Sequence, residues 1–143
     1  MLHHDGVVFE DNAAERLRAI QRYSINTHGW VDIPYHYLID REGNIYEGRP
    51  PYAVGDTATA YDPTGHILIT VLGDYNVQEV DARQIEAIIT LATWLSASYG
   101  IPPQNIAGHR DYAVTSCPGA HLYAYLSNGY ITGEVARRLA EQP

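Results

Sequence analysis

Residues 66–73 read HILITVLG, and this stretch decides the fold class. Its side chains are nearly all apolar and many are β-branched, which is typical of a strand covered on both faces. A strand of that kind needs helices packed on each side of its sheet. The sequence therefore predicts an α/β fold in which a central mixed β-sheet is flanked by helices.

Earlier segments of the chain supply further strands. YHYLID at 35–40 and NIYEG at 44–48 are short β-rich runs, and the residues between them end in Gly43. Two such runs joined through a glycine turn predict a β-hairpin. LHH at 2–4 can add one more strand to the same sheet.

A first helix is predicted from Asn12 to Gly29. Asn12 followed by Glu15 has the spacing of a capping box, and Gly29 is a typical residue at a helix end. Between them the apolar residues recur on one side of the helix, at Leu17, Ile20 and Ile25.

A second helix is predicted from Asp81 to Gly100, because Asp81 and Gln84 repeat the capping box and Gly100 stops the pattern. Its apolar residues follow at helical spacing, at Ile85, Ile88, Ile89, Ala92, Leu95 and Tyr99. A shorter helix, entered at proline, is predicted from Pro118 to Leu126.

Length and charge restrict the domain organisation and the partners. A chain of 143 residues with no repeat and no interdomain linker favours one domain, at residues 1–143. Its net charge of −8 repels phosphate backbones, so no nucleic-acid partner is expected. The apolar stretches are too short to span a bilayer. All nine basic residues are Arg, which excludes any mechanism based on a lysine ammonium and is typical of a GC-rich bacterial or phage genome.

The residues that can carry chemistry are concentrated in GHRDYAVTSCPG at 108–119. Imidazole nitrogen and thiolate sulfur both bind zinc, so His109 and Cys117 are candidate ligands if a loop turns them toward each other. A third ligand can come from His3 or His4, but adjacent strand residues face opposite sides, so only one of them should serve. Two histidines and one cysteine leave a fourth position open, as in catalytic zinc sites.

Cys117 is the only cysteine, so no intramolecular disulfide can form and the redox compartment stays open. The thiol can equally be a buried hydrophobic group, a nucleophile or a metal ligand. The first ten residues, MLHHDGVVFE, show no signal peptide, and the sequence leaves the localisation undecided.

Three segments carry a family resemblance: LHH at 2–4, GWVDIPYHYLIDREGNIYEGR at 29–49, and AGHRDYAVTSCPG followed by LY at 107–123. In this order they resemble the type 2 N-acetylmuramoyl-L-alanine amidases, a family shared by phage lysozyme-like amidases and peptidoglycan recognition proteins. The segments frame nearly the whole chain. The resemblance implies a single catalytic domain with the α/β fold of that family.

The resemblance also assigns residues. It implies one Zn²⁺ per chain, held by His3, His109 and Cys117. It places Tyr35 over the metal-bound water and Thr115 at the family's last catalytic position, where some members carry lysine. We expect Tyr35 to orient and stabilise rather than to abstract a proton, because a phenol with a pKa of about 10 is a poor base at neutral pH.

The implied reaction hydrolyses the amide between the lactyl group of N-acetylmuramic acid and the L-alanine of the stem peptide. Peptidoglycan or a muropeptide is then the partner, in the cell wall, and the chain is expected to be a monomer, as a released phage enzyme or an excised domain. Three alternatives remain open. The chain can be a recognition module that binds without cleaving, a cytoplasmic amidase that recycles anhydromuropeptides, or an unrelated protein with a structural zinc.

Three features depart from the family pattern. The chain begins only two residues before His3, and Thr57 replaces a histidine in the segment where many members read GAHA. Pro50 and Pro51 follow EGR in place of a pair that helps animal members to distinguish stem peptides. Stem-peptide preference therefore cannot be transferred.

The other polar and aromatic candidates are expected to be structural. If His4 and His36 both sit on strands, they should face away from the proposed site. Arg110 and Asp111 should pair to hold the loop that aims His109. Trp30 should anchor the sheet, and the alternative is that it lines the groove. Surface or satisfied core positions are expected for His28, His66 and His121.

Overall fold

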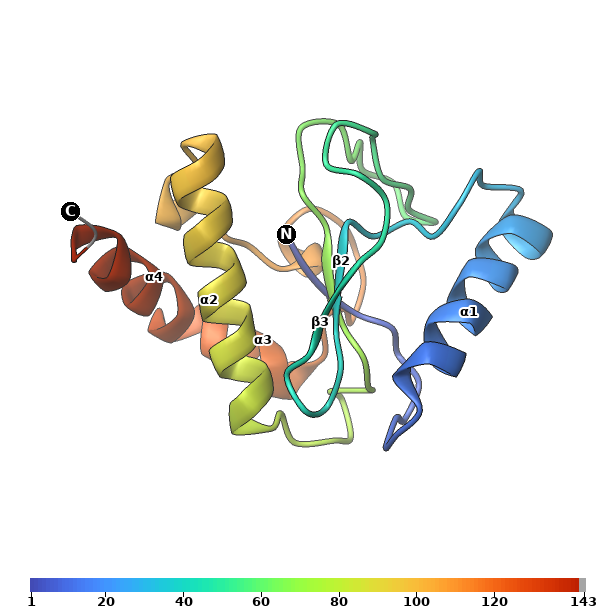
Figure 1. The fold of residues 1–143 in the computed structure, drawn as a ribbon, viewed down its shortest axis with the longest axis horizontal. Coiled ribbons are helices and arrows are strands. Elements are labelled where there is room, and N and C mark those ends of the chain that lie inside the picture. The colour runs from blue at the N-terminus through green and yellow to red at the C-terminus, as the bar shows by residue number, and fades with distance from the viewer. Residues whose placement is uncertain (142–143) are drawn as a thin grey trace.

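Four short strands form one mixed sheet, which stands in the middle of the molecule (Figure 1). In spatial order they are β1 (Leu2–His4), β4 (Ile69–Val71), β2 (Tyr37–Ile39) and β3 (Ile45–Glu47). β4 runs parallel to both β1 and β2, and β3 pairs antiparallel with β2. The computed structural model, which describes residues 1–141, thus confirms the predicted mixed sheet and hairpin.

The alternation of side chains along the strands produces a separate core on each face of the sheet. Strand β4 and the residue on each side of it, Leu68 and Leu72, are all buried, as expected for a strand covered on both sides. One face packs against α2, α3 and α4, and the other faces α1 (Figure 1). His3 and Leu38 both pair in register with Thr70, so β1 presents His3 on the same face as Leu38, the face toward α1.

The first helix begins as predicted and ends differently. Asn12 accepts a hydrogen bond from the Glu15 amide at the start of α1 (Ala13–Tyr23), and a π-helical turn (Ser24–His28) continues to Gly29, which has φ 71°. Ile25 lies in this π-helical turn and is exposed. The prediction of one regular helix with Ile25 on its buried side was wrong.

Three helices cover the opposite face. α2 (Ala82–Tyr99) has the predicted capping box and ends at Gly100, and α3 (Ala120–Ser127) begins two residues after Pro118. The sequence reading did not include α4 (Tyr130–Ala140), which packs against α2 and α3. Two short 3₁₀ turns lie between α2 and α3, at Pro103–Asn105 and His109–Asp111. Within the described residues, no helix is both long and apolar enough to cross a bilayer.

Asp40 organises the turn of the β2–β3 hairpin. Its buried carboxylate accepts hydrogen bonds from the amides of Glu42 and Asn44, from the Asn44 side chain and from the Tyr46 hydroxyl, each at 2.9 Å. Burial acts to raise the pKa of Asp40, but the hydrogen bonds from Asn44, Tyr46 and Glu42 together outweigh it and lower the pKa below its ordinary value of 3.8. The turn is therefore built around an ionised carboxylate.

Replacing Asp40 with Ala is expected to lower the free energy of unfolding at pH 7 by about 2–3 kcal/mol, because several donors lose a charged acceptor. Since the folded pKa is the lower one, this stabilisation is present above pH 4 and is lost as the pH falls through the folded value. Urea unfolding at pH 7 and at pH 3 measures both effects. Glu42→Gln, a change at an exposed neighbour, should cost less than about 0.5 kcal/mol. Equal losses in the two variants would contradict the role of Asp40.

Candidate active site

Backbone pairing brings the two predicted histidine ligands together. The Leu2 amide donates to the Ala107 carbonyl at 2.8 Å, and Leu2 forms a parallel bridge with Gly108. This pairing lays the loop that carries His109 along β1, next to His3. The two imidazole rings lie 4.6 Å apart, measured between their centroids.

Cys117 reaches the same point from the far end of that loop. The Arg110 amide donates to the Cys117 carbonyl at 3.0 Å, which closes the loop on itself. The His4 amide lies 3.4 Å from the Cys117 sulfur, which ties the thiol to β1. The chain then turns sharply at Gly119, with φ 90°, where a Cβ atom would lie 2.5 Å from the Tyr75 carbonyl carbon. Only glycine allows this close approach.

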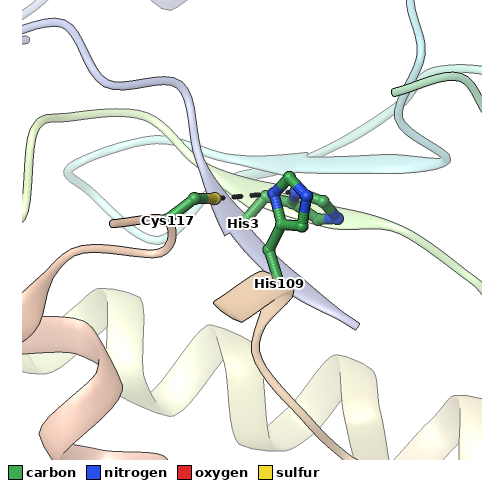
Figure 2. A group of neighbouring side chains, drawn as sticks. All are labelled: His3, His109 and Cys117. Atoms are coloured by element: carbon green, nitrogen blue, oxygen red, sulfur yellow. Dashed lines mark hydrogen bonds between the residues drawn. The ribbon is translucent and has the colours of Figure 1, made fainter. Parts of the chain in front are cut away.

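The resulting cluster has the dimensions of a metal site. One ligand atom from each of His3, His109 and Cys117 lies within 4.8 Å of the others, and all three residues are buried (Figure 2). The Cys117 Sγ to His3 Nδ1 distance is 3.6 Å. Zinc bonds of about 2.3 Å to sulfur and 2.0–2.1 Å to nitrogen, at a tetrahedral angle, separate the two ligand atoms by about 3.6 Å. The donor set and its spacing therefore fit a zinc ion.

The electrostatics of the cluster agree with that fit. Burial, followed by the neighbouring His109, holds the pKa of His3 well below its ordinary value, and burial also lowers the pKa of His109. Both imidazoles are neutral at pH 7, so their lone pairs are available to a cation. His3 Nε2 is buried and has no hydrogen-bond partner among residues 1–141. Burial raises the pKa of the Cys117 thiol to about 12, so metal binding must displace a proton from the sulfur.

Tyr35 lies beside the cluster, with its ring 5.4 Å from that of His3 between centroids. Its backbone is fixed from behind, because the Arg49 amide donates to the Tyr35 carbonyl at 2.8 Å. Gly48 makes this contact possible, since a Cβ atom there would lie 2.4 Å from the same carbonyl oxygen. Burial, followed by the charge of Cys117, raises the pKa of Tyr35 above its ordinary value, so its hydroxyl is a donor at neutral pH.

Thr115 also lines the cavity, two residues before Cys117. Its Oγ1 accepts a hydrogen bond from the Cys117 amide at 3.2 Å, which is the local backbone contact common for loop threonines. The hydroxyl hydrogen is still free to donate to another group. Thr115 therefore supports the Cys117 turn and also presents a donor beside the cluster.

These residues line a cavity of about 690 Å³ between α1, the sheet and two loops. The volume lies within the range typical of ligand sites. On its rim, the His28 and Trp30 rings stack with centroids 4.2 Å apart. Trp30 lines the cavity, so the expectation that it anchors the sheet was wrong and the alternative of groove lining agrees with the structure.

The family model described as N-acetylmuramoyl-L-alanine amidase matches residues 1–120. The chain belongs to this amidase family. Peptidoglycan-recognition protein SC1a of Drosophila melanogaster is 32% identical over 132 residues, covering 86% of this chain and 68% of that protein. The family resemblance found in the sequence is thereby confirmed.

Solved structures of the family share the fold. The amidase LysC from Clostridium intestinale matches with a TM-score of 0.74 and 27% identity, over 99% of this chain and 83% of LysC. The complex of tracheal cytotoxin with the recognition proteins LCa and LCx matches with a TM-score of 0.80 and 25% identity, over 88% of this chain and 78% of that one. The amidase fold thus occurs in chains named as enzymes and in chains named as recognition proteins.

His4, which follows His3 on β1, and His36, which lies just before β2, bond to backbone groups outside the cluster, although His4 also lines the cavity. His4 Nδ1 accepts a hydrogen bond from the Tyr75 amide at 3.1 Å. His36 accepts one from the Leu68 amide at 2.8 Å and contacts the Ala53 carbonyl through its other nitrogen. Each of these rings is held by the backbone of a neighbouring segment.

Of the remaining histidines, His66 and His121 have the expected ordinary surroundings, whereas His28 lines the cavity beside Trp30. His121 contacts the Gln78 carbonyl at 2.7 Å, His66 packs edge-on against Tyr112, and His28 is exposed on the cavity rim.

The loop that carries His109 is held by different contacts from the predicted ones. Arg110 and Asp111 do not pair with each other within the described residues. The Asp111 carboxylate instead accepts from the Gly108 amide at 2.8 Å and from the Tyr123 hydroxyl at 2.6 Å. Arg110 lies over the Tyr123 ring and donates to the Ser116 carbonyl. Both residues hold the loop, through partners that are distant in sequence.

Sequence reasoning missed one segment of the site, the loop that contains Thr57 and Thr59. Thr59 Oγ1 lies 2.6 Å from His109 Nε2, and Thr57 and Thr59 both line the cavity. The Arg49 guanidinium fixes this loop through the Val54 carbonyl and through an ion pair with Asp56 at 2.8 Å. The departure from GAHA at Thr57 marked this segment in the sequence. The contact of Thr59 with His109 could not be read from it, because the two residues are 50 positions apart.

Proposed function

We propose that this protein is a zinc-dependent N-acetylmuramoyl-L-alanine amidase. It would hydrolyse the amide bond between the lactyl group of N-acetylmuramic acid and the L-alanine that begins the stem peptide of peptidoglycan. The observation that carries the proposal is the meeting of His3, His109 and Cys117 on the wall of one cavity, in a chain of the amidase family.

The metal ligands and the hydrogen-bond donors have separate tasks in this proposal. His3, His109 and Cys117 would hold one Zn²⁺, and three protein ligands leave a position for water or substrate. Bound there, zinc would lower the pKa of a water to about 7 and polarise the scissile carbonyl. Neutral imidazoles and a thiol that loses its proton give the site a net negative charge, which favours a divalent cation.

Tyr35 and Thr115 would act on the substrate. Tyr35 donates its hydroxyl hydrogen toward the carbonyl oxygen as negative charge develops there. Its raised pKa keeps the phenol protonated, which suits a donor and not a base. Thr115 offers a second hydroxyl from the cavity wall, because only its oxygen is engaged by the Cys117 amide.

A recognition module that binds peptidoglycan without cleaving it is the second candidate, since relatives such as SC1a are named recognition proteins. The discriminating residue is Cys117, because family members that only bind typically lack the cysteine ligand. This chain has the cysteine, both histidines and Tyr35 together, so the enzyme is the favoured function. A structural zinc site is disfavoured because three candidate ligands, not four, meet among residues 1–141.

Mass spectrometry of a defined muropeptide tests the proposal. After incubation with zinc-loaded protein, we expect two products: a saccharide with a free lactyl carboxylate and a peptide with a free L-alanine amine. Removing the metal with a chelator should stop the reaction, and added zinc should restore it. Stoichiometric zinc and muropeptide binding with an intact substrate would instead establish the recognition module.

The choice of substrate separates the two enzymatic roles. Cleavage of intact sacculi supports a cell-wall amidase, whereas cleavage of soluble anhydromuropeptides alone would assign the protein to recycling.

A further inference from the structure

The imidazole of His109 has a hydrogen-bond partner that comes from a distant loop. Thr59 Oγ1 lies 2.6 Å from His109 Nε2, and this threonine also contacts Thr57 Oγ1 at 2.7 Å. The Thr59 amide donates to the same Thr57 oxygen at 3.1 Å, which fixes the turn between the two threonines. His109 Nε2 is therefore engaged by the hydroxyl of Thr59, which is in turn hydrogen-bonded to the hydroxyl of Thr57, and both threonines line the cavity.

The occupied nitrogen determines which atom of His109 can bind a cation. A neutral imidazole carries a hydrogen on one nitrogen and a lone pair on the other. With Nε2 facing Thr59, the other nitrogen is Nδ1, and a ring nitrogen of His109 faces Cys117 in Figure 2. Nδ1 can bind a metal only if the hydrogen sits on Nε2, where it must be donated to Thr59.

We propose that Thr59 is the positioning residue for His109. Its hydroxyl oxygen accepts the Nε2 hydrogen, selects that tautomer and leaves the Nδ1 lone pair aimed at the space between His3 and Cys117. The Thr59 hydroxyl then donates its own hydrogen to Thr57 Oγ1, so each group in this series of hydrogen bonds has a consistent donor or acceptor role. This inference rests on the metal site of the proposed function. A metal-bound histidine generally needs such a partner on its other nitrogen.

The surroundings of Thr59 are built to keep it in place. Arg49 is buried, and it donates from Nε to the Ile33 carbonyl at 3.1 Å while its Nη2 pairs with Asp56 at 2.8 Å. The loop is thus tied to the sheet region three residues before Thr59. Tyr61, two residues after it, packs its ring 5.1 Å from the His109 ring between centroids. The contact is part of a fixed arrangement on both sides of the threonine.

Zinc affinity in variants of Thr59 tests the proposal. Thr59→Val keeps the shape and removes the hydroxyl, and it should weaken zinc binding by about 10–100-fold in competition with a fluorescent chelator. Thr59→Ser keeps the hydroxyl and is the matched control, with an affinity expected within about threefold of the wild type. Equal zinc affinity in the wild type and the folded valine variant would overturn the proposal.

Nitrogen NMR tests the tautomer without a substitution. In the ¹⁵N-histidine-labelled wild-type protein, the zinc-free form should show His109 with its hydrogen on Nε2, and the zinc-loaded form should show coordination through Nδ1. Coordination through Nε2 would overturn the inference even if the valine variant failed to fold. His3 and His109 signals are assigned from His3→Gln and His109→Gln samples.

These readouts are independent of amide hydrolysis. A protein that binds zinc with the expected dependence on Thr59 but leaves every muropeptide intact would refute the proposed function and support the role of Thr59. A protein that cleaves muropeptides equally well with valine at position 59, at limiting zinc, would do the reverse.

Discussion

Cys117→Ser is expected to weaken zinc binding by about a hundred- to thousandfold and to remove amidase activity. Four-coordinate zinc sites bind the ion with a free energy of about 10–16 kcal/mol, so each ligand contributes about 3 kcal/mol or more. Losing one ligand therefore lowers the zinc affinity by about a hundred- to thousandfold. Serine has nearly the same volume as cysteine, so the buried turn at Cys117 should persist. Its hydroxyl ionises far less readily than a thiol and is a poor zinc ligand.

Two measurements separate metal loss from unfolding. Zinc should raise the thermal midpoint of the wild-type protein, because a ligand that binds only the folded state stabilises it by mass action. The same addition should raise the midpoint of Cys117→Ser far less. Ser116→Ala, at the exposed neighbouring position, is the matched control and should respond to zinc like the wild type. An equal zinc-dependent rise of the midpoint in Cys117→Ser and in the wild type would show that the sulfur is not a ligand.

Much of the fold could be predicted because local patterns and tertiary packing agree. The capping box of Asp81 and Gln84 and the apolar spacing after it specify α2 at both ends. The stretch at 66–73 has no polar face, so it had to lie inside a sheet covered on both sides. Such patterns are decided by residues that are close in sequence.

Two helical features could not be predicted, a π-helical turn and the helix α4. A π-helical turn at Ser24–His28 follows the regular helix, Ile25 in this turn is exposed, and Trp30 just after it lines the cavity. The sequence shows no breaker before Gly29 that would mark this change. In α4, the spacing of Ile131 and Val135 does indicate a buried helical stripe, but the segment is short and contains Gly133.

The candidate site also has residues that could be predicted from the sequence and residues that could not. His3, His109 and Cys117 could be proposed because imidazole and thiol are recognisable zinc ligands and because the family resemblance orders them along the chain. The groups that orient these three ligands could not be predicted. Thr59 lies in a loop without apolar periodicity, so nothing nearby in the sequence indicates its contact with His109. Asp111 accepts hydrogen bonds from Gly108 and Tyr123 and does not pair with its neighbour Arg110. Such pairings are set by the tertiary fold and not by adjacency.

Tyr35→Phe is expected to lower kcat by about 10²–10³-fold, the typical cost of losing one donor to a developing oxyanion. The variant removes only the hydroxyl and keeps the ring that packs 5.4 Å from His3. Zinc affinity should therefore stay within about twofold of the wild type. KM should change little, because the hydrogen bond is strongest where the charge develops and not in the bound substrate.

This pattern of kinetic constants distinguishes a donor from the other roles open to Tyr35. A structural role would change zinc affinity or the free energy of unfolding, and a binding role would raise KM while leaving kcat intact. A base role would require ionisation near neutral pH, whereas burial and Cys117 raise the pKa of Tyr35. Tyr52→Phe, which removes a hydroxyl from a side chain that is 90% exposed, is the control and should leave both constants unchanged. Full turnover in zinc-loaded Tyr35→Phe would mean that the site stabilises the oxyanion without the phenol, through the metal and Thr115.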